Sequence, residues 1–128
     1  MCLYSKTRIP KIATKDIQVY KVVKQEDKEL VTPYLNYKVS KIMKTSFKEC
    51  IKIILNMRRN PYNEYEIGYG FIHSCTSFQN ARFIRISLSY YNYTDADKYK
   101  IITGIIPKGS LYYENKGDCC SNKLILDL

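Results

Sequence analysis

The sequence predicts an α+β fold, in which a largely antiparallel sheet of about six strands is combined with two helices in a single domain, residues 1–128. Most apolar segments alternate with a period of two residues, which is typical of strands with one buried face. Only two segments change to the spacing of an amphipathic helix. Because the strands are not regularly interleaved with helices, a wound parallel sheet is not expected.

The composition limits the classes of protein that need considering. With 45% apolar residues, 4 prolines and 5 glycines, the chain is not expected to be disordered. No apolar run approaches the roughly 20 residues of a transmembrane helix, so we expect no membrane span. The N-terminal residues lack the apolar core of a secretory signal, and the 5 cysteines are an odd number. Both features indicate free thiols in a reducing cytoplasm.

The formal net charge of +9 favours a negatively charged partner, such as nucleic acid or a phosphorylated small molecule. Most of the basic residues are lysines spread over every segment, which is also the pattern of a solvated surface in the product of an AT-rich gene. With one histidine and no C-x-x-C pair, we predict no metal site and no cofactor. The few carboxylates cluster in turns, which argues against a paired-carboxylate hydrolase.

The first part of the chain is expected to be extended. A basic arm over 1–14, held by Leu3 and Ile9, precedes a strand over 17–23. A polar turn and a short strand over 30–32 lead to a third strand over 35–43. In the strand over 17–23, one face carries Ile17, Val19 and Val23, and the other carries Gln18, Tyr20 and Val22. In the strand over 35–43, the predicted inward-facing residues are Leu35, Tyr37 and Val39.

The first helix is expected to begin after Ser46, because Ser46-Phe-Lys-Glu49 fits a capping box. It would run for about three turns and end near Asn60-Pro61, since the residue before proline avoids helical geometry. Arg58 and Arg59 would then lie in the last turn, where cations stabilise the helix end. Its predicted apolar face consists of Phe47, Cys50, Ile51, Ile54 and Leu55.

The second half is expected to begin with a strand over 64–72, whose Gly68 and Gly70 indicate a bulge or a close backbone approach. A second helix follows, with its inward face formed by Phe78, Ala81, Ile84 and Leu88. After a tyrosine-rich loop over 90–97, the predicted strands are a central one over 98–106, apolar on both faces, a short one over 111–113 and a closing one over 121–128, with a turn over 115–118.

The candidate functional site is the junction between the strand ending at Ile72 and the second helix. A helix N-terminus offers free N–H groups and a partial positive charge, which favour phosphate or carboxylate. Plain helix capping uses the same residue types and is the alternative interpretation. The predicted ligand-binding residues are His73, Ser74, Thr76, Ser77, Arg82 and Arg85.

If the protein is an enzyme, His73 is the catalytic candidate, because imidazole titrates near neutral pH. Neighbouring strand residues point alternately, so the adjacent Ser74 does not by itself form a dyad with it. A hydrogen-bonded structural histidine is the alternative. The many tyrosines could stack on bases, although half-buried positions on a sheet explain them as well.

A frame covering nearly the whole chain resembles a known family. It consists of Ile12-Ala-Thr-Lys-Asp-Ile-Gln-Val-Tyr-Lys-Val22, Gly70-Phe-Ile-His-Ser74, Ala81, Ile106-Pro-Lys-Gly-Ser-Leu-Tyr-Tyr113 and Ser121-Asn-Lys-Leu-Ile125. This frame resembles a family of small uncharacterised proteins from gut anaerobes and their phages. The resemblance implies a phage or mobile-element setting, in the host cell cytoplasm, and implies no particular activity.

A second resemblance is to ADP-ribosyltransferase-like folds, in which a strand leads into a Ser-Thr-Ser motif and a later strand carries an E-x-E pair. Here a tyrosine-bearing strand is followed by Ser74-Cys-Thr-Ser77 with Ala81 downstream, and a later strand ends at Ser110. The segment after Tyr113 contains no E-x-E pair. The resemblance therefore implies kinship of fold without the catalytic glutamates.

These observations favour a small, non-enzymatic cytoplasmic binding protein of phage or mobile-element type. Its junction over 70–82 would recognise an anionic partner, which is a nucleotide, a nucleic acid or an acidic protein surface. One alternative is an enzyme acting on a nucleotide such as NAD, with His73 and one hydroxyl at its centre. The other is a virion or assembly component that acts through a protein interface.

Overall fold

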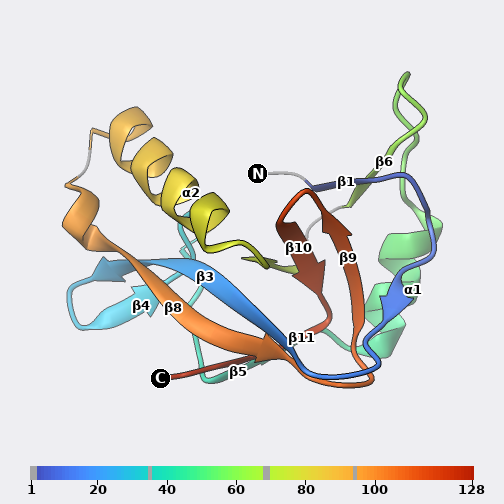
Figure 1. Cartoon of the computed structure of the whole chain (residues 1–128), viewed down its shortest axis with the longest axis horizontal. Coiled ribbons are helices and arrows are strands. Elements are labelled where there is room, and N and C mark those ends of the chain that lie inside the picture. Colours follow the sequence, from blue (N-terminus) through green and yellow to red (C-terminus); the bar gives the residue numbers. More distant parts are fainter. Residues whose placement is uncertain (1–2, 35, 68–69, 94) are drawn as a thin grey trace.

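The computed structural model describes residues 3–34, 36–67, 70–93 and 95–128. It confirms the α+β class, with two helices and a large antiparallel sheet (Figure 1). The predicted number of strands was too low. The described residues form one sheet of nine strands and a second sheet of two. The count rose because the N-terminal arm and the predicted turn over 115–118 both contribute to pairing.

The elements follow one another as β1 (Leu3–Ser5), β2 (Lys11–Ile12), β3 (Ile17–Glu26), β4 (Glu29–Val31), β5 (Ile42–Lys44), α1 (Phe47–Leu55), β6 (Tyr65–Ile67), β7 (Ile72–Cys75), α2 (Phe78–Tyr91), a 3₁₀ turn (Ala96–Lys98), β8 (Tyr99–Ile106), β9 (Leu111–Asn115), β10 (Asp118–Ser121) and β11 (Lys123–Leu126). In the large sheet they are ordered β2-β9-β10-β7-β3-β8-β11-β5, and β4 also pairs with β3. The small sheet is β1-β6.

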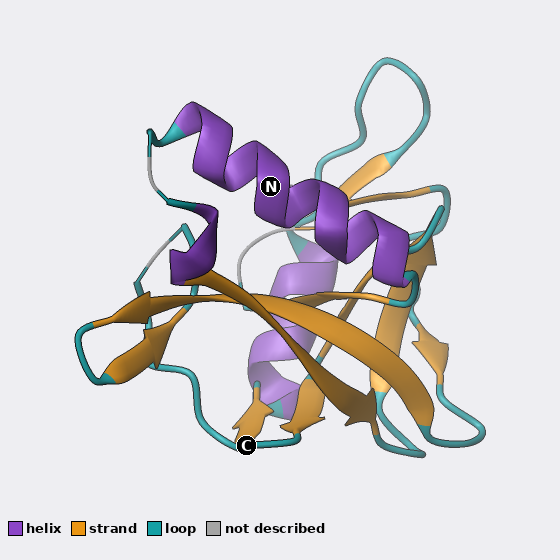
Figure 2. Ribbon diagram, turned by 60° about the vertical axis from the view of Figure 1, so that its left-hand side comes forward, coloured by secondary structure: helices purple, strands orange, loops and turns teal. Residues whose placement is uncertain are grey.

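The ribbon of β3 and β8 is the centre of the large sheet, as predicted for the doubly apolar segment 98–106. Its register runs without interruption from Ile17↔Ile106 to Lys24↔Tyr99. Helix α2 lies across this ribbon (Figure 2) and buries Ala81, Ile84 and Leu88, as its spacing predicts. Phe78 is more exposed than expected, and its ring contacts Tyr20 edge-on at 5.3 Å.

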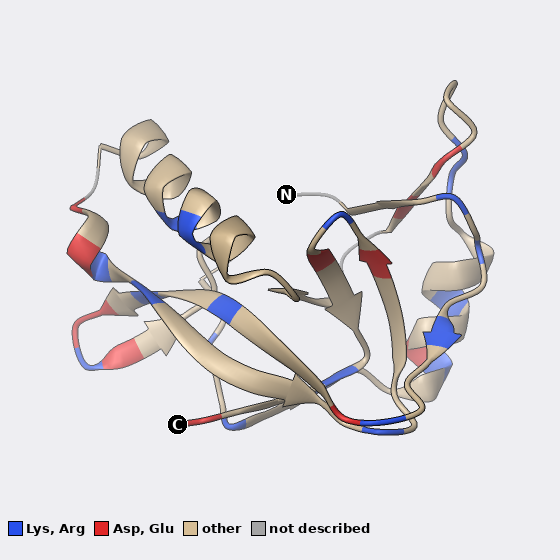
Figure 3. Ribbon diagram, in the orientation of Figure 1, with Lys and Arg blue, Asp and Glu red and all other residues tan. Residues whose placement is uncertain are grey.

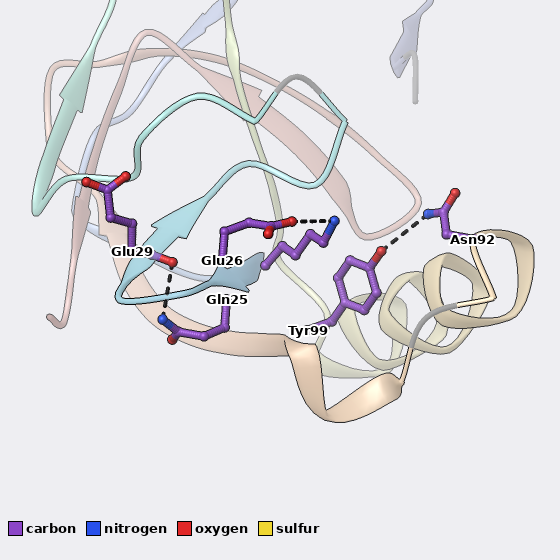
Figure 4. A network of polar contacts seen from close by, with 6 residues as sticks. Gln25, Glu26, Glu29, Asn92 and Tyr99 are labelled. Atoms are coloured by element: carbon purple, nitrogen blue, oxygen red, sulfur yellow. Dashed lines mark hydrogen bonds and ion pairs between the residues drawn. The ribbon is translucent and has the colours of Figure 1, made fainter.

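Two side-chain contacts stabilise the end of the β3–β8 ribbon that is formed by Tyr99 and the β3–β4 hairpin. The Asn92 amide donates to the hydroxyl of Tyr99 at 3.3 Å, which ties the C-terminal end of α2 to β8 (Figure 4). Gln25 donates to the carbonyl of Glu29 at 3.2 Å and closes the β3–β4 hairpin. These contacts stabilise the ribbon at the end away from the N-terminal arm.

Helix α1 begins as predicted and ends early. The Ser46 hydroxyl accepts from the N–H of Glu49 at 3.2 Å, which confirms the cap. The helix ends at Leu55, because the Asn56 side chain donates to the Lys52 carbonyl and Arg59 pairs with Tyr65 in an antiparallel bridge. Arg58 and Arg59 therefore lie beyond the helix and not in its last turn. Of the predicted apolar face, Cys50 is buried, whereas Phe47, Ile51 and Leu55 are exposed.

The segment 35–43 is mostly not a strand. A tight loop forms after Pro33, in which the N–H of Tyr37 donates to the Thr32 hydroxyl at 3.0 Å and the N–H of Thr32 to the Tyr37 carbonyl at 2.8 Å. The end of the predicted strand pairs as β5, and Lys38 forms one isolated antiparallel bridge with Val31. Val39 is buried as predicted, Tyr37 is 65% exposed, and Leu35 lies outside the described residues.

Three further boundaries differ from the prediction. The segment 64–72 divides into β6 and β7, separated by Gly70 with φ 115°, while Gly68 lies outside the described residues. Residues 118–121 form β10, so the turn itself is confined to Lys116 and Gly117. In the arm, Leu3 is buried as expected, but Ile9 is 76% exposed.

Candidate functional site

The predicted junction at the start of α2 is covered by the chain itself. Ser77 is the N-cap and accepts from the N–H of Asn80 at 3.3 Å. The N–H groups of Thr76 and Ser77 donate to the carbonyl of Gly117, at 2.9 and 3.4 Å. The Asn80 side chain donates to the Lys116 carbonyl at 2.8 Å. The β9–β10 turn thus supplies acceptors for the N–H groups of Thr76 and Ser77 and for the Asn80 side chain.

The other predicted site residues lie apart from this junction. Ser74 is 1% exposed, and its hydroxyl is 3.1 Å from the Sγ of Cys119. The Nε of Arg85 donates to the Tyr99 carbonyl at 2.7 Å, and its guanidinium is 3.6 Å from Asp97. Arg82 is exposed on the surface of α2. Only Thr76 and Ser77 share the junction, and Arg85 holds the 3₁₀ turn against the helix.

A cavity of about 560 Å³ lies elsewhere, between β3, β7 and the loop after β4. Strands β3 and β7 share one register pair among the described residues, Tyr20↔Cys75. Because the ladder does not continue past this pair, space opens between them. The lining is mainly apolar, and the exposed side chains of Tyr34, Tyr37 and Glu66 stand where the cavity meets solvent.

Lys21 of β3 lines this cavity and is 5% exposed. Its Nζ donates to the backbone carbonyl of His73 at 2.7 Å, across the gap where the two strands diverge. Within the described ranges, no carboxylate lies within 4.0 Å of that ammonium group. Burial lowers the pKa of Lys21 from 10.5 to about 8, since the charged form loses its hydration.

Two of the predicted site residues, His73 and Ser74 of β7, line the cavity together with Lys21. The Nε2 of His73 is buried and has no hydrogen-bond partner among the described residues. Burial, reinforced by the charge of Lys21, lowers the pKa of His73 from 6.5 to about 4. The imidazole is therefore neutral at physiological pH and can accept or donate one proton at a ring nitrogen.

The thiols around the cavity are unreactive. Cys75 and Cys120 line it, and burial raises the pKa of Cys75 to about 12, with the charge of Asp118 adding to the shift. Burial also raises the pKa of the neighbouring Cys119 to about 11. A nucleophilic cysteine needs the opposite shift. No cluster of three metal-ligating side chains occurs in the part of the chain that the structure describes.

The sequence contained a signal for Lys21 that the prediction did not use. Residues 17, 19, 21 and 23 fall on one face of a strand, and Ile17, Val19 and Val23 make that face apolar. Lys21, at the third of these positions, therefore lies among apolar residues. Buried unpaired lysines are rare, so this position marks a candidate site.

No family model, curated protein or solved structure matches the chain. Over the described residues, neither helix has the length and apolar character needed to cross a membrane. The basic residues occupy helices, strands and loops and are interspersed with acidic ones (Figure 3). The charge distribution in this view does not single out one stripe, so the cavity is the most distinctive chemical feature of the chain.

Proposed function

We propose that the protein binds a small organic anion, an alkyl monocarboxylate, in the cavity between β3 and β7. The observation that carries the proposal is the buried Lys21, an ammonium group that faces an apolar cavity without a carboxylate partner among the described residues. Burying an unpaired charge costs several kcal/mol. A carboxylate from a ligand would remove most of that cost.

The head group follows from the hydrogen-bonding capacity of Lys21. An ammonium group has three N–H donors, and one of them donates to His73 O. The remaining two match the acceptor oxygens of one carboxylate, and charge-assisted hydrogen bonds are roughly twice as strong as neutral ones. One buried cation balances one negative charge, which favours a monoanion over a polyphosphate.

The body of the ligand follows from the walls. Leu3, Val22, Ile67, Phe71 and Ile84 contribute apolar surface, and burying alkyl groups yields about 0.8 kcal/mol per CH₂. A cavity of about 560 Å³ is within the range that encloses a drug-sized molecule. The expected anionic partner is thereby narrowed to a small molecule, in place of nucleic acid or a protein surface.

Calorimetric titration with straight-chain carboxylates from butanoate to dodecanoate tests the proposal. Affinity should rise with chain length, and the alcohol of equal length should bind at least tenfold more weakly. Lys21→Met should abolish the preference for the carboxylate over the alcohol. The preference should also decline as the pH rises above 8, because Lys21 then loses its charge.

Lys24→Met is the matched control, because Lys24 lies on the same strand, pairs with Glu26 at 2.6 Å and does not line the cavity. It removes the same charge and should leave binding unchanged. Absence of binding across the whole series contradicts the proposal. An equal loss of affinity in both lysine variants also contradicts it, because the attraction would then come from the net charge.

A further inference from the structure

We propose that Lys21 is also a nucleophilic amine, which forms an imine with apolar aldehydes that enter the cavity. The inference rests on the proposed function to the extent that the same cavity must admit an apolar ligand. Imine formation would be a covalent reaction in the same cavity, and the reacting atom would be the Nζ of Lys21. The aldehyde class follows from the walls, which match an alkyl chain.

The geometry around Lys21 favours this chemistry. Its Nζ is fixed by the 2.7 Å hydrogen bond to His73 O, so the amine is held at the cavity wall. The described residues place no carboxylate within 4.0 Å that would keep it protonated by pairing. Desolvation in an apolar pocket is one way in which proteins activate lysine for attack on carbonyls.

The protonation state supports the same conclusion. With a pKa of about 8, roughly a tenth of the Lys21 side chains are neutral at pH 7. An exposed lysine with a pKa of about 10.4 is neutral in fewer than about one molecule in a thousand at that pH. Lys21 should therefore react with a carbonyl far more readily than the surface lysines.

The reaction balances without an oxidant or reductant. The lone pair of the neutral amine attacks the carbonyl carbon, and the electron pair of the C=O π bond moves to oxygen. A proton passes from nitrogen to oxygen and gives a carbinolamine. The C–O bond then breaks, the C=N bond forms, and one water leaves. The second proton of the nitrogen leaves with the hydroxyl group as that water.

Reductive trapping on the wild-type protein tests the inference. Decanal with cyanoborohydride at pH 7 should convert the imine to a stable secondary amine, and peptide mapping by mass spectrometry locates the adduct. We expect at least tenfold more adduct at Lys21 than at the average surface lysine. Excess decanoate should suppress the adduct at Lys21 alone. Propanal, which gains little from the apolar walls, should show no preference for Lys21.

Decanoate binding and reductive trapping are measured separately on the wild-type protein, so the two proposals can fail independently. Lys24→Met, which removes a lysine outside the cavity, should keep the preferred adduct at Lys21. Adducts spread evenly over the lysines of the wild-type protein overturn the inference. Adducts at Lys21 that persist in excess decanoate, although decanoate binds, also overturn it. Binding of decanoate without trapping at Lys21 overturns the inference and leaves the proposed function standing. Trapping at Lys21 in a protein that does not bind decanoate overturns only the anion proposal.

Discussion

The junction at the start of α2 and the cavity between β3 and β7 both contain the residue types of an anion site, yet they differ in how those groups are paired. At the junction, the N–H groups of Thr76 and Ser77 donate to Gly117 O. The Ser77 hydroxyl accepts from the Asn80 N–H, and the Asn80 amide donates to Lys116 O. In the cavity, Lys21 has a single backbone partner, and the Nε2 of His73 has none among the described residues.

This contrast shows that an anion-binding site cannot be located from the types of polar residue alone, because the pairing of those residues also matters. Hydroxyls and free N–H groups at a helix start are paired internally when a turn lies over them. Buried polar groups that lack partners have a cost, and that cost is a reason to expect a ligand. The following predictions separate the two regions by their response to pH and to substitution.

The largest effect should come from Lys21 at alkaline pH. Its pKa is about 8 in the folded state against 10.5 in the unfolded chain, so the unfolded state holds a proton that the folded state has released. Stability should therefore rise by about 3 kcal/mol as the pH increases through this window. Urea unfolding of the wild type and of Lys21→Met measures the difference. The rise should be missing in that variant and present in Lys24→Met.

An effect of similar size is expected from His73 at acid pH. Its pKa of about 4 lies below the usual 6.5, so its contribution is complete above pH 6.5 and is lost as the pH falls toward 4. The loss should be about 3 kcal/mol. Because the chain contains one histidine, its proton NMR signal is unambiguous. A midpoint near 6.5 in the folded protein would show that the imidazole is not buried as described.

At the junction, Gly117→Ala should cost about 2 kcal/mol of stability, because φ is 89° and the new Cβ would lie 2.6 Å from the Nδ2 of Asn80. Gly109→Ala is the matched control, with the same φ and nothing within 4 Å of the Cβ. It should cost about 1 kcal/mol, from backbone strain alone. Thermal unfolding compares the two. Equal losses of stability in the two variants would mean that the β9–β10 turn does not contact the start of α2 as closely as described.

The smallest effect should come from Ser77→Ala, which removes the N-cap of α2 and should cost about 1 kcal/mol. The affinity for decanoate should not change, because Ser77 does not line the cavity. Calorimetry on this variant separates the two regions directly. If Ser77→Ala weakened binding as much as Lys21→Met does, the anion site would be at the junction.

Local rules were sufficient for the parts of the fold that depend on local contacts. Ser46 and Ser77 cap the two helices, and Ala81, Ile84 and Leu88 face the sheet as their spacing indicates. The predicted boundaries were wrong where pairing with a segment distant in the sequence determines the structure. Helix α1 ends before Asn56 because the following residues pair with β6, and β10 exists because Asp118–Ser121 lies between β7 and β9. Neither partner is visible from the local pattern.

The site was predictable only in part. His73 was selected as the single histidine, and it does line the cavity. Strands β3 and β7 share the register pair Tyr20↔Cys75, and pairing between residues 55 positions apart cannot be read from either strand alone. Lys21 was within reach of the alternation rule, which places it on the same face as Ile17, Val19 and Val23.

The limited pairing of β3 and β7 also has a consequence for how such a protein can evolve. Lys21 and His73 are carried by strands, whose positions depend on backbone hydrogen bonds and tolerate exchange of neighbouring side chains. Part of the wall belongs to the loop containing Thr32, Pro33 and Tyr37, which is closed by hydrogen bonds between Thr32 and the backbone of Tyr37. Because these bonds do not use the Tyr37 side chain, that side chain can be exchanged without opening the loop. Such a substitution would change the wall of the cavity while the amine of Lys21 and the imidazole of His73 stay in place.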